Sequence, residues 1–352
     1  MRIGLVAPPW IPVPPPRYGG IEQVVASLGS QLAARGHDVT LVAAPGSDIP
    51  GVRTLTPLSE APRTIGEPGV ERRYLAAGLA RLERPDVIID HSGPLGAVLV
   101  GACGRPALHV VHGPLGPPEA SRYARICTRA PGLGLIALSA SQRAQAPWLP
   151  FAGTCRPGLS VEDLPFGDRP GEHLAFLGRI CPEKGPLEAI EVARRCGRPL
   201  MIAAKCREPA EQEYFERCVS PRLGGQIRYL GELGAERKYE LLAGARALLF
   251  PIAWPEPFGL VLIEAMACGT PVLATRCGAV PEIVIDGTTG FVGEDVDALV
   301  DAESRLDQVC RTSCRSHVVE RFSADAMASA YEATIAEHLA TSRRGDGGPP
   351  GR

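Results

Sequence analysis

The chain has 352 residues, of which 45% are hydrophobic and 22% are charged, and its formal net charge is −2. A chain of this length can bury a substantial core and usually forms two domains. The near-neutral charge and the absence of Lys/Arg runs argue against nucleic-acid binding. We therefore expect a protein that acts on small molecules.

The N-terminus carries no pattern that predicts export. Residues 1–7 lead directly into prolines, so they are too short and too interrupted for the apolar region of a signal peptide. No apolar stretch is long enough to span a bilayer. The eleven cysteines are scattered without a Cys-x2-Cys pair, so neither a zinc site nor a disulfide framework is indicated. We expect a cytoplasmic protein without stable membrane insertion.

The N-terminal half alternates short apolar runs with helical patterns. A strand over 3–7, a helix over 21–35 and a strand over 38–43 form a βαβ unit. Continuous apolar strands separated by helices imply a parallel sheet that is covered on both faces. Further strands are predicted over 86–89, 107–111 and 135–138.

The alternation begins again after 164–171, a segment rich in turn formers that we interpret as an interdomain linker. The predicted fold class is α/β, with domains over 1–165 and 172–322. A helix over 323–340, which can pack back on the N-terminal domain, and a disordered tail over 341–352 follow. The elements predicted in the second domain are strands over 174–177, 200–203, 227–230 and 247–250, and helices over 187–195 and 236–243.

The most informative segment contains two glutamates eight positions apart, Glu256 and Glu264. An apolar helix is predicted to begin at Gly259 and to end in a left-handed glycine cap at 269. Its first N–H groups, at Phe258, Gly259 and Leu260, lack intrahelical partners and suit an anionic ligand. Ionised carboxylates accept hydrogen bonds from hydroxyls. The combination predicts a ligand in which a sugar is joined to a phosphate.

Two cations, Arg179 and Lys184, lie in the loop that follows the strand over 174–177. Ligands of open parallel sheets bind beyond the carboxyl ends of the strands. The two cations can therefore clamp a diphosphate and neutralise the charge that grows on it as it departs. The alternative is a pair of solvated surface cations. Lys205 and Arg207, after the next strand, are weaker candidates.

The first strand leads through a proline-rich loop over 8–16 to Gly19 and Gly20, at the start of the first helix. Two glycines allow a backbone to approach a ligand closely, although a plain helix-entry turn fits as well. The Gly-x-Gly-x-x-Gly pattern of nicotinamide dinucleotide sites is absent. The stiff proline-rich loop could shape an acceptor pocket, but its role is open.

His112 follows the strand over 107–111, where a ring nitrogen can reach the hydroxyls of a substrate, although a structural role is equally compatible. His91 is a weaker candidate of the same kind. Ser139 is expected to cap a helix. The Gly-x-Ser-x-Gly elbow of serine hydrolases is absent.

Taken together, these segments resemble the retaining glycosyltransferases of family four, which adopt the GT-B fold of two facing Rossmann-like domains. The similarity covers most of the chain. Its most specific part is Glu-Pro-Phe-Gly-Leu-Val-Leu-Ile-Glu over 256–264, which matches the family's Glu-x7-Glu signature. Supporting matches are the segments 178–185, 18–23, 35–39 and 281–290.

The resemblance implies roles for the matching residues of the second domain. Glu256 would contact hydroxyls of the donor sugar, and Glu264 would contact the nucleotide ribose. The amides of 258–260 would meet sugar and phosphate, and Arg179 with Lys184 would hold the diphosphate. A nucleotide-sugar donor is therefore the implied co-substrate.

The resemblance also implies roles in the first domain. Gly19 and Gly20 would approach the diphosphate, and His112 would lie near the reacting sugar. The family generally needs no metal and no cofactor for catalysis, and the Asp-x-Asp over 295–297 is expected to cap a helix. The proline-rich loop and 66–73 follow no generic family pattern, so the resemblance leaves the acceptor unidentified.

The resulting hypothesis is a retaining, metal-independent, hexosyltransferase-type enzyme. It would move a sugar from a UDP- or GDP-linked donor to a hydroxyl of a small metabolite or natural product. Two alternatives remain open: a protein of this fold that binds a nucleotide sugar without transfer, and one that uses it for epimerisation or a non-glycosidic coupling. The sequence does not indicate an oligomeric state.

Overall fold

The computed structural model describes residues 1–62 and 64–345. It forms two compact units: unit 1 comprises Met1–Pro15, Gly19–Gly158 and the helix that begins at Ala324, and unit 2 comprises Pro16–Tyr18 and Leu159–Ser323. The chain thus leaves unit 1 after Gly158, ahead of the predicted linker over 164–171. That segment belongs to unit 2 because it is bonded there: the Gly167 N–H donates to the carbonyl of Cys268 at 3.0 Å.

Unit 1 is built on a parallel sheet, which in the described residues has seven strands in the order β3-β2-β1-β4-β5-β6-β7. The central strands are apolar and buried on both faces, as a sheet covered by helices requires. The α/β fold with parallel sheets that the sequence predicts is therefore confirmed. The strands are β1 (Arg2–Val6), β2 (Asp38–Val42), β3 (Arg53–Leu55), β4 (Val87–Asp90), β5 (Ala107–Val110), β6 (Leu133–Ala137) and β7 (Phe151–Thr154).

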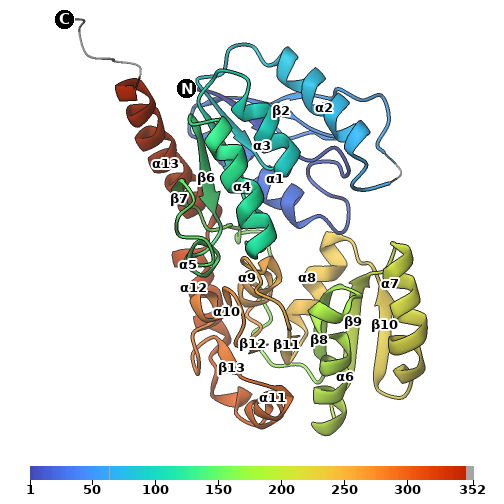
Figure 1. Cartoon of the computed structure of the whole chain (residues 1–352). Helices are drawn as coiled ribbons and strands as arrows, with labels where there is room; N and C mark the ends of the chain where they lie inside the picture. Colours follow the sequence, from blue (N-terminus) through green and yellow to red (C-terminus); the bar gives the residue numbers. More distant parts are fainter. Residues whose placement is uncertain (63, 346–352) are drawn as a thin grey trace, which may run out of the picture. The chain divides into compact units, whose positions relative to one another are not determined.

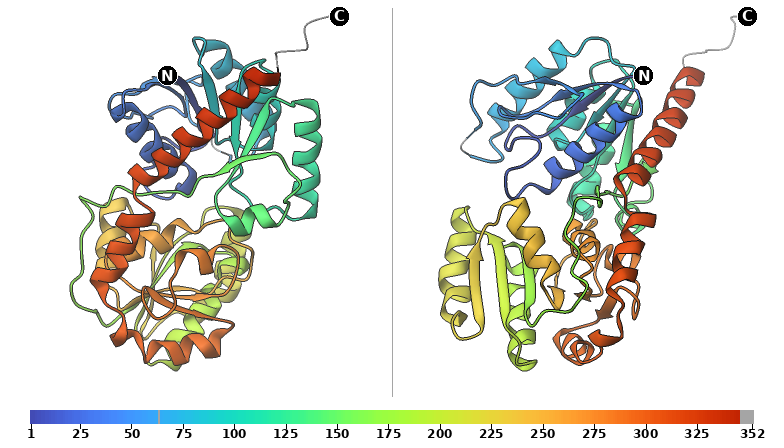
Figure 2. Two further views of the ribbon diagram at one scale, coloured as in Figure 1. Left: turned by 90° about the vertical axis from the view of Figure 1, so that its left-hand side faces the viewer. Right: turned by 180° about the vertical axis from the view of Figure 1, so that it is seen from behind.

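Helices cover both faces of this sheet (Figure 1). On one side α3 packs between α2 and α4, and on the other α1 packs against α13. Figure 2 shows α13 lying along unit 1 beside α1. The helices are α1 (Gly20–Ala34), α2 (Pro68–Arg81), α3 (Pro94–Gly101), α4 (Pro117–Arg129), α5 (Ala140–Ala144) and α13 (Ala324–Gly345).

The C-terminal helix α13 is held on unit 1 by an apolar face and by ion pairs. Tyr331 and Ile335 are fully buried. Glu332 accepts from Arg35 at 2.5 Å and pairs with His37 at 2.8 Å. The helix runs to Gly345, so it takes in 341–345, the first part of the predicted tail over 341–352. The rest of the predicted tail lies outside the described residues.

Unit 2 repeats the architecture with a second parallel sheet, six-stranded within the described residues, in the order β10-β9-β8-β11-β12-β13. The central β8, with β9 on one side and β11 on the other, provides the carboxyl edge considered below. The strands are β8 (Leu174–Arg179), β9 (Leu200–Lys205), β10 (Ile227–Gly231), β11 (Ala247–Phe250), β12 (Val272–Thr275) and β13 (Gly290–Gly293).

Helices again lie on both faces of the sheet. Helix α6 packs against α11, while α9 packs against α8 and α12. Short 3₁₀ turns cover Pro182–Lys184, Ser220–Arg222 and Leu306–Gln308, and a π-helical turn covers Phe215–Val219. The helices are α6 (Pro186–Arg195), α7 (Pro209–Tyr214), α8 (Ala235–Ala243), α9 (Leu260–Ala267), α10 (Val280–Ile283), α11 (Val296–Glu303) and α12 (Arg311–Arg321).

Helix α9 ends as the sequence predicts. Gly269 is left-handed, with φ of 82°. Its N–H donates to the carbonyl of Met266 at 2.9 Å, and the N–H of Thr270 donates to that of Ala265 at 2.9 Å. These two bonds form a Schellman motif, which satisfies carbonyls that the helix end would otherwise leave unpaired. The chain then enters β12 directly.

Gly269→Ala is expected to lower the free energy of unfolding by about 1–3 kcal/mol, because an L side chain is strained at this φ and a Cβ would approach Phe166 to 2.6 Å. Gly132→Ala is the matched control, since its Cβ would meet no heavy atom within 4 Å. Urea unfolding of both variants measures the difference. Equal stability of the two would contradict the assignment of strain to Gly269.

Candidate active site

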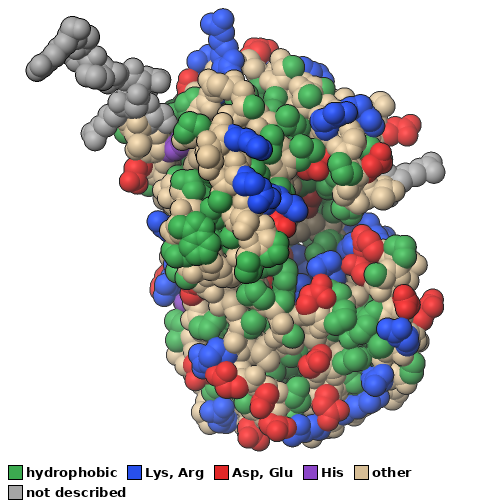
Figure 3. Space-filling view, viewed as in Figure 1, with side chains coloured by type: hydrophobic (Ala, Val, Ile, Leu, Met, Phe, Trp, Pro, Cys, Tyr) green, Lys and Arg blue, Asp and Glu red, His purple; other side chains and the backbone are tan. Residues whose placement is uncertain are grey.

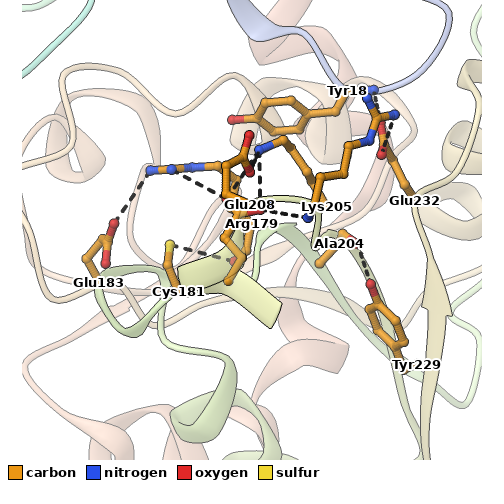
Figure 4. A network of polar contacts seen from close by, with 11 residues as sticks. Tyr18, Arg179, Cys181, Glu183, Ala204, Lys205, Glu208, Tyr229 and Glu232 are labelled. Carbon is orange, nitrogen blue, oxygen red and sulfur yellow. Dashed lines mark hydrogen bonds and ion pairs between the residues drawn. The ribbon is translucent and has the colours of Figure 1, made fainter. Parts of the chain in front are cut away.

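A cluster of charged side chains lies at the carboxyl edge of β8 and β9. Arg179 and Lys205 are register partners at the ends of these strands. Both pair with Glu211 of α7, at 3.7 Å from the Arg179 Nη1 and 3.3 Å from the Lys205 Nζ. Arg179 also pairs with Glu183 at 3.5 Å, and Lys205 pairs with Glu208. Figure 4 shows Arg179, Glu183, Lys205 and Glu208 gathered around the two strand ends.

The same cluster extends to the end of β10. Arg207 pairs with Glu232 at 2.7 Å. Glu232 also accepts from the backbone N–H of Tyr18 at 2.9 Å, and the Lys205 Nζ lies 5.6 Å from the centre of the Tyr18 ring (Figure 4). Cations and carboxylates thus alternate across three neighbouring strand ends.

Lys184 and Glu256 form a second group. Lys184 lies in the 3₁₀ turn after β8, and its Nζ donates to the Oε2 of Glu256 in the loop between β11 and α9. The same oxygen accepts from the indole N–H of Trp254 at 2.9 Å, and the Lys184 Nζ lies 4.6 Å from the centre of that indole ring. Gly185 allows the two loops to meet, because a Cβ there would lie 2.0 Å from the carbonyl oxygen of Pro251.

Glu264 lies on the second turn of α9, and its hydrogen-bond partners differ from those of Glu256. Its Oε1 accepts from the Lys238 Nζ at 2.6 Å and from the Tyr239 hydroxyl at 3.4 Å. Both partners come from α8, the neighbour of α9. Burial, together with the adjacent carboxylate, raises the pKa of Tyr239 well above its usual value. This tyrosine is therefore a neutral hydrogen-bond donor.

The N-terminus of α9 has the backbone groups that the sequence predicts. Gly259 is left-handed, with φ of 89°, and precedes the first helical residue. Across the described chain, the N–H groups of Phe258, Gly259 and Leu260 find no backbone carbonyl to donate to. They carry the positive end of the helix dipole, where an anionic group is stabilised.

In unit 1, polar side chains gather at the carboxyl ends of β4 and β5. The His91 Nδ1 and the His112 Nε2 lie 2.9 Å apart, so one of these nitrogens carries the shared proton. Burial lowers the pKa of His112 to about 3, with a further contribution from His109. Burial also lowers the pKa of His91 well below its usual value. Both rings are neutral at physiological pH and can exchange hydrogen bonds with hydroxyls.

The histidines rest on a buried network. The His109 Nδ1 lies 2.6 Å from Asp90, whose other oxygen accepts from Ser92, and the His109 Nε2 lies 3.0 Å from the Tyr123 hydroxyl. Gln142 of α5 donates to the carbonyls on both sides of His112, at 2.7 Å each. These contacts position the loop that carries His112.

Gly19 and Gly20 lie where the proline-rich loop enters α1. A Cβ at Gly19 would lie 2.6 Å from Pro15 and 2.9 Å from the Glu22 Oε2, so only glycine fits there without displacement. Glu22 is buried on the first turn of α1, and burial raises its pKa to about 7. At pH 7 this carboxyl is about half protonated, so it repels an anion near these glycines less than a fully ionised carboxylate would.

The structure joins some of the predicted residues and separates others. Lys184 is in contact with Glu256. Arg179 pairs instead with Glu183 and Glu211, and among the described residues neither of these carboxylates pairs with Lys184. Glu264 has partners of its own. Gly19, Gly20 and His112 belong to unit 1, and the other predicted site residues belong to unit 2.

Sequence reasoning missed several partners of these residues. Trp254 lies two positions before Glu256, so its nearness in the chain was a usable signal. Glu211 and Lys238 lie on separate helices and carry no motif that marks them. Ser139 caps α5 as the sequence predicts, since its hydroxyl accepts from the Gln142 N–H at 3.0 Å. Asp295 likewise caps α11, as expected.

The described residues contain no group of three or more His, Cys, Asp or Glu side chains that could hold a metal ion. None of their helices is both long and apolar enough to cross a bilayer. On the visible face of unit 2, acidic and basic side chains are interspersed (Figure 3).

Comparisons with known proteins agree with this picture. A family model described as "Glycosyl transferases group 1" matches residues 168–308, and a second, "Glycosyltransferase Family 4", matches residues 18–146. Glycogen synthase of Mycobacterium tuberculosis is 27% identical, over 100% of this chain and 97% of that protein.

Solved structures match over almost the whole chain. AviGT4, a glycosyltransferase involved in avilamycin A biosynthesis, is 29% identical with a TM-score of 0.72, over 97% of this chain and 98% of that one. HepE of Anabaena in complex with UDP-glucose is 19% identical with a TM-score of 0.73, over 97% of this chain and 100% of that one.

The raised pKa of Glu22 predicts a pH-dependent stability. The folded state keeps the proton that the unfolded chain releases near pH 4.5, so stability should fall as pH rises from 4.5 to about 7 and then level off. Glu22→Gln should abolish this loss, on the order of 3 kcal/mol at pH 8. Unfolding at pH 5 and pH 8 tests it, with exposed Glu60→Gln as the control. A Glu22→Gln variant with the wild-type pH slope would disprove it.

Proposed function

The chain belongs to the family-four glycosyltransferases, and on that premise we propose that it transfers a sugar from a nucleoside-diphosphate donor to an acceptor hydroxyl. The α/β architecture of its two units is that of GT-B glycosyltransferases. The donor is a UDP- or GDP-sugar. The solved complex of HepE with UDP-glucose supports a donor of this class.

The observation that carries the proposal is the arrangement around the start of α9. The Lys184–Glu256 ion pair lies in the loops beside three N–H groups for which the described part of the chain offers no backbone acceptor. In the proposed complex, Glu256 accepts from hydroxyls of the donor sugar and Lys184 turns to a phosphate oxygen. The α9 amides also bind the phosphate, and Glu264 accepts from the ribose hydroxyls.

The proposed mechanism relies on charge neutralisation at the leaving group. As the bond between the sugar and the diphosphate breaks, negative charge grows on the diphosphate. Arg179, Lys184 and the start of α9 stabilise it, so no metal is required. Attack comes from the same face of the sugar, and the leaving phosphate oxygen takes the acceptor's proton. The anomeric configuration is therefore retained.

Unit 1 supplies neutral polar groups in this proposal. The neutral His112 binds a hydroxyl of the reacting sugar, and the backbone at Gly19 and Gly20 approaches the diphosphate. The acceptor is a hydroxyl of a small metabolite or natural product. The relation to a glycosyltransferase involved in avilamycin A biosynthesis supports that acceptor class.

The direct test measures release of UDP or GDP when the protein is supplied with nucleotide sugars and candidate acceptors. NMR of the product reports the anomeric configuration. Release that depends on an acceptor, with retention, is the expected result. Donor binding without release would favour a binding protein instead, and a changed sugar without acceptor would favour epimerisation.

Lys184→Ala is expected to lower kcat by about 10²-fold or more, because the leaving diphosphate loses a positioned cation. Steady-state kinetics with saturating donor measures the effect. Arg195→Ala is the control: it removes an exposed cation of α6 whose partner is Asp297. Near-normal turnover of a folded Lys184→Ala variant would exclude the proposed role.

A further inference from the structure

The cations at the ends of β8, β9 and β10 are paired with glutamates of the protein itself. Arg179, Lys205 and Arg207 contribute three positive charges, and the carboxylates paired with them, Glu183, Glu208, Glu211 and Glu232, contribute four negative ones. A diphosphate added to this network would meet a net negative charge. At least one carboxylate must therefore give up its cation before an anion can bind well.

The two glutamates on Lys205 differ sharply in how firmly they are held. The Glu211 side chain is 6% exposed, and its Oε2 accepts from the backbone N–H groups of Arg207 and Glu208 at 3.0 and 3.3 Å. It also pairs with Arg179 and Lys205 at once. The Glu208 side chain is 41% exposed, and Lys205 is the one cation with which it forms a salt bridge among the described residues. Its carboxylate also accepts from the backbone N–H of Glu211 in the capping box of α7. Water can replace the Lys205 bond of the exposed Glu208, which can remain the N-cap of α7, but water cannot reach the buried Glu211 in the same way.

The distribution of lysine supports a special role for Lys205. The chain contains three lysines, Lys184, Lys205 and Lys238, against many arginines. Each of the three pairs with a glutamate in the candidate site. Lysine carries a compact charge with rotatable donors, whereas arginine offers a rigid fork. A compact ammonium suits a position where one acceptor is exchanged for another.

We propose that Glu211 is a positioning residue that holds Lys205 beside Arg179, and that Glu208 is a displaceable counter-ion. In the free protein Glu208 occupies the acceptor position on Lys205 that a donor phosphate takes when it binds. Glu208 then moves into water, while Glu211 keeps both cations in place. This inference rests on the proposed function, because it assumes that the ligand of this edge is a nucleoside diphosphate.

The proposal predicts opposite effects for two similar substitutions. Glu208→Gln removes the competing charge, so UDP or GDP should bind about tenfold more tightly. Glu211→Gln leaves Lys205 with Glu208 as its single charged partner, which makes Glu208 harder to displace. The same nucleotide should then bind about tenfold more weakly. A purely electrostatic effect would instead strengthen binding in both variants.

The experiment measures the Kd of UDP and of GDP by isothermal titration calorimetry for wild type and variants. Glu213→Gln is the matched control, since it removes a charge from an exposed position of α7. A double-mutant cycle combines Glu208→Gln with Lys205→Met and measures whether the change in Kd depends on Lys205. A purely structural effect of Glu208→Gln would not depend on it. The gain from Glu208→Gln should vanish when Lys205 is absent, because no ammonium then remains to be released.

The outcomes separate this inference from the proposed function. If wild type binds neither nucleotide, both are wrong. If wild type binds and the two Gln variants shift the Kd in the same direction, or the Glu208→Gln gain persists without Lys205, this inference alone is overturned. Thermal unfolding of Glu211→Gln verifies that the variant is folded. If Glu211→Gln does not fold, Glu208→Gln decides the question. If this variant does not bind the nucleotide more tightly in the presence of Lys205, Glu208 is not a displaceable counter-ion.

Discussion

The parallel pairing of β8 with β9 and β11 is the constraint on which the candidate site of unit 2 depends. Parallel strands bring the loops at their carboxyl ends to the same edge of a sheet. The register places Arg179 opposite Lys205, and the loop after β11 carries Glu256 toward the turn that holds Lys184. Residues that are far apart in the chain thereby share one edge. Without this pairing the cations and carboxylates would be unrelated surface charges.

Charge balance explains how such a cluster is tolerated without a ligand. Each lysine of the chain is paired with a glutamate, and Glu211 serves two cations at once. Partly buried charges are costly unless they are paired, so these pairs keep the polar edge compatible with folding. The same pairs can be exchanged for bonds to an anion and to hydroxyls. The same charged groups therefore stabilise the free protein and bind the ligand.

In unit 1 the polar side chains of the candidate site are mainly neutral rather than charged. Burial keeps His91 and His112 neutral and raises the pKa of Glu22 to about 7. Its carboxyl edge is therefore rich in neutral donors and acceptors rather than in paired charges. Groups of this kind suit hydroxyls, whereas the cations of unit 2 suit phosphates. In the described residues the first six strands of each unit have the same order, but the residues at the strand ends give each unit its own chemistry.

The sequence by itself determined the α/β class, most of the central strands, the glycine-capped helix α9 and its unpaired N-terminal amides. These follow from local periodicity and from glycine conformation, which act over a few residues. Only the tertiary structure decided that Lys184 pairs with Glu256, that Arg179 shares Glu211 with Lys205, and that Lys238 meets Glu264. The short strands β12 and β13 and the full length of α13 were decided in the same way. Each depends on contacts between distant segments, and local periodicity does not encode which segments meet.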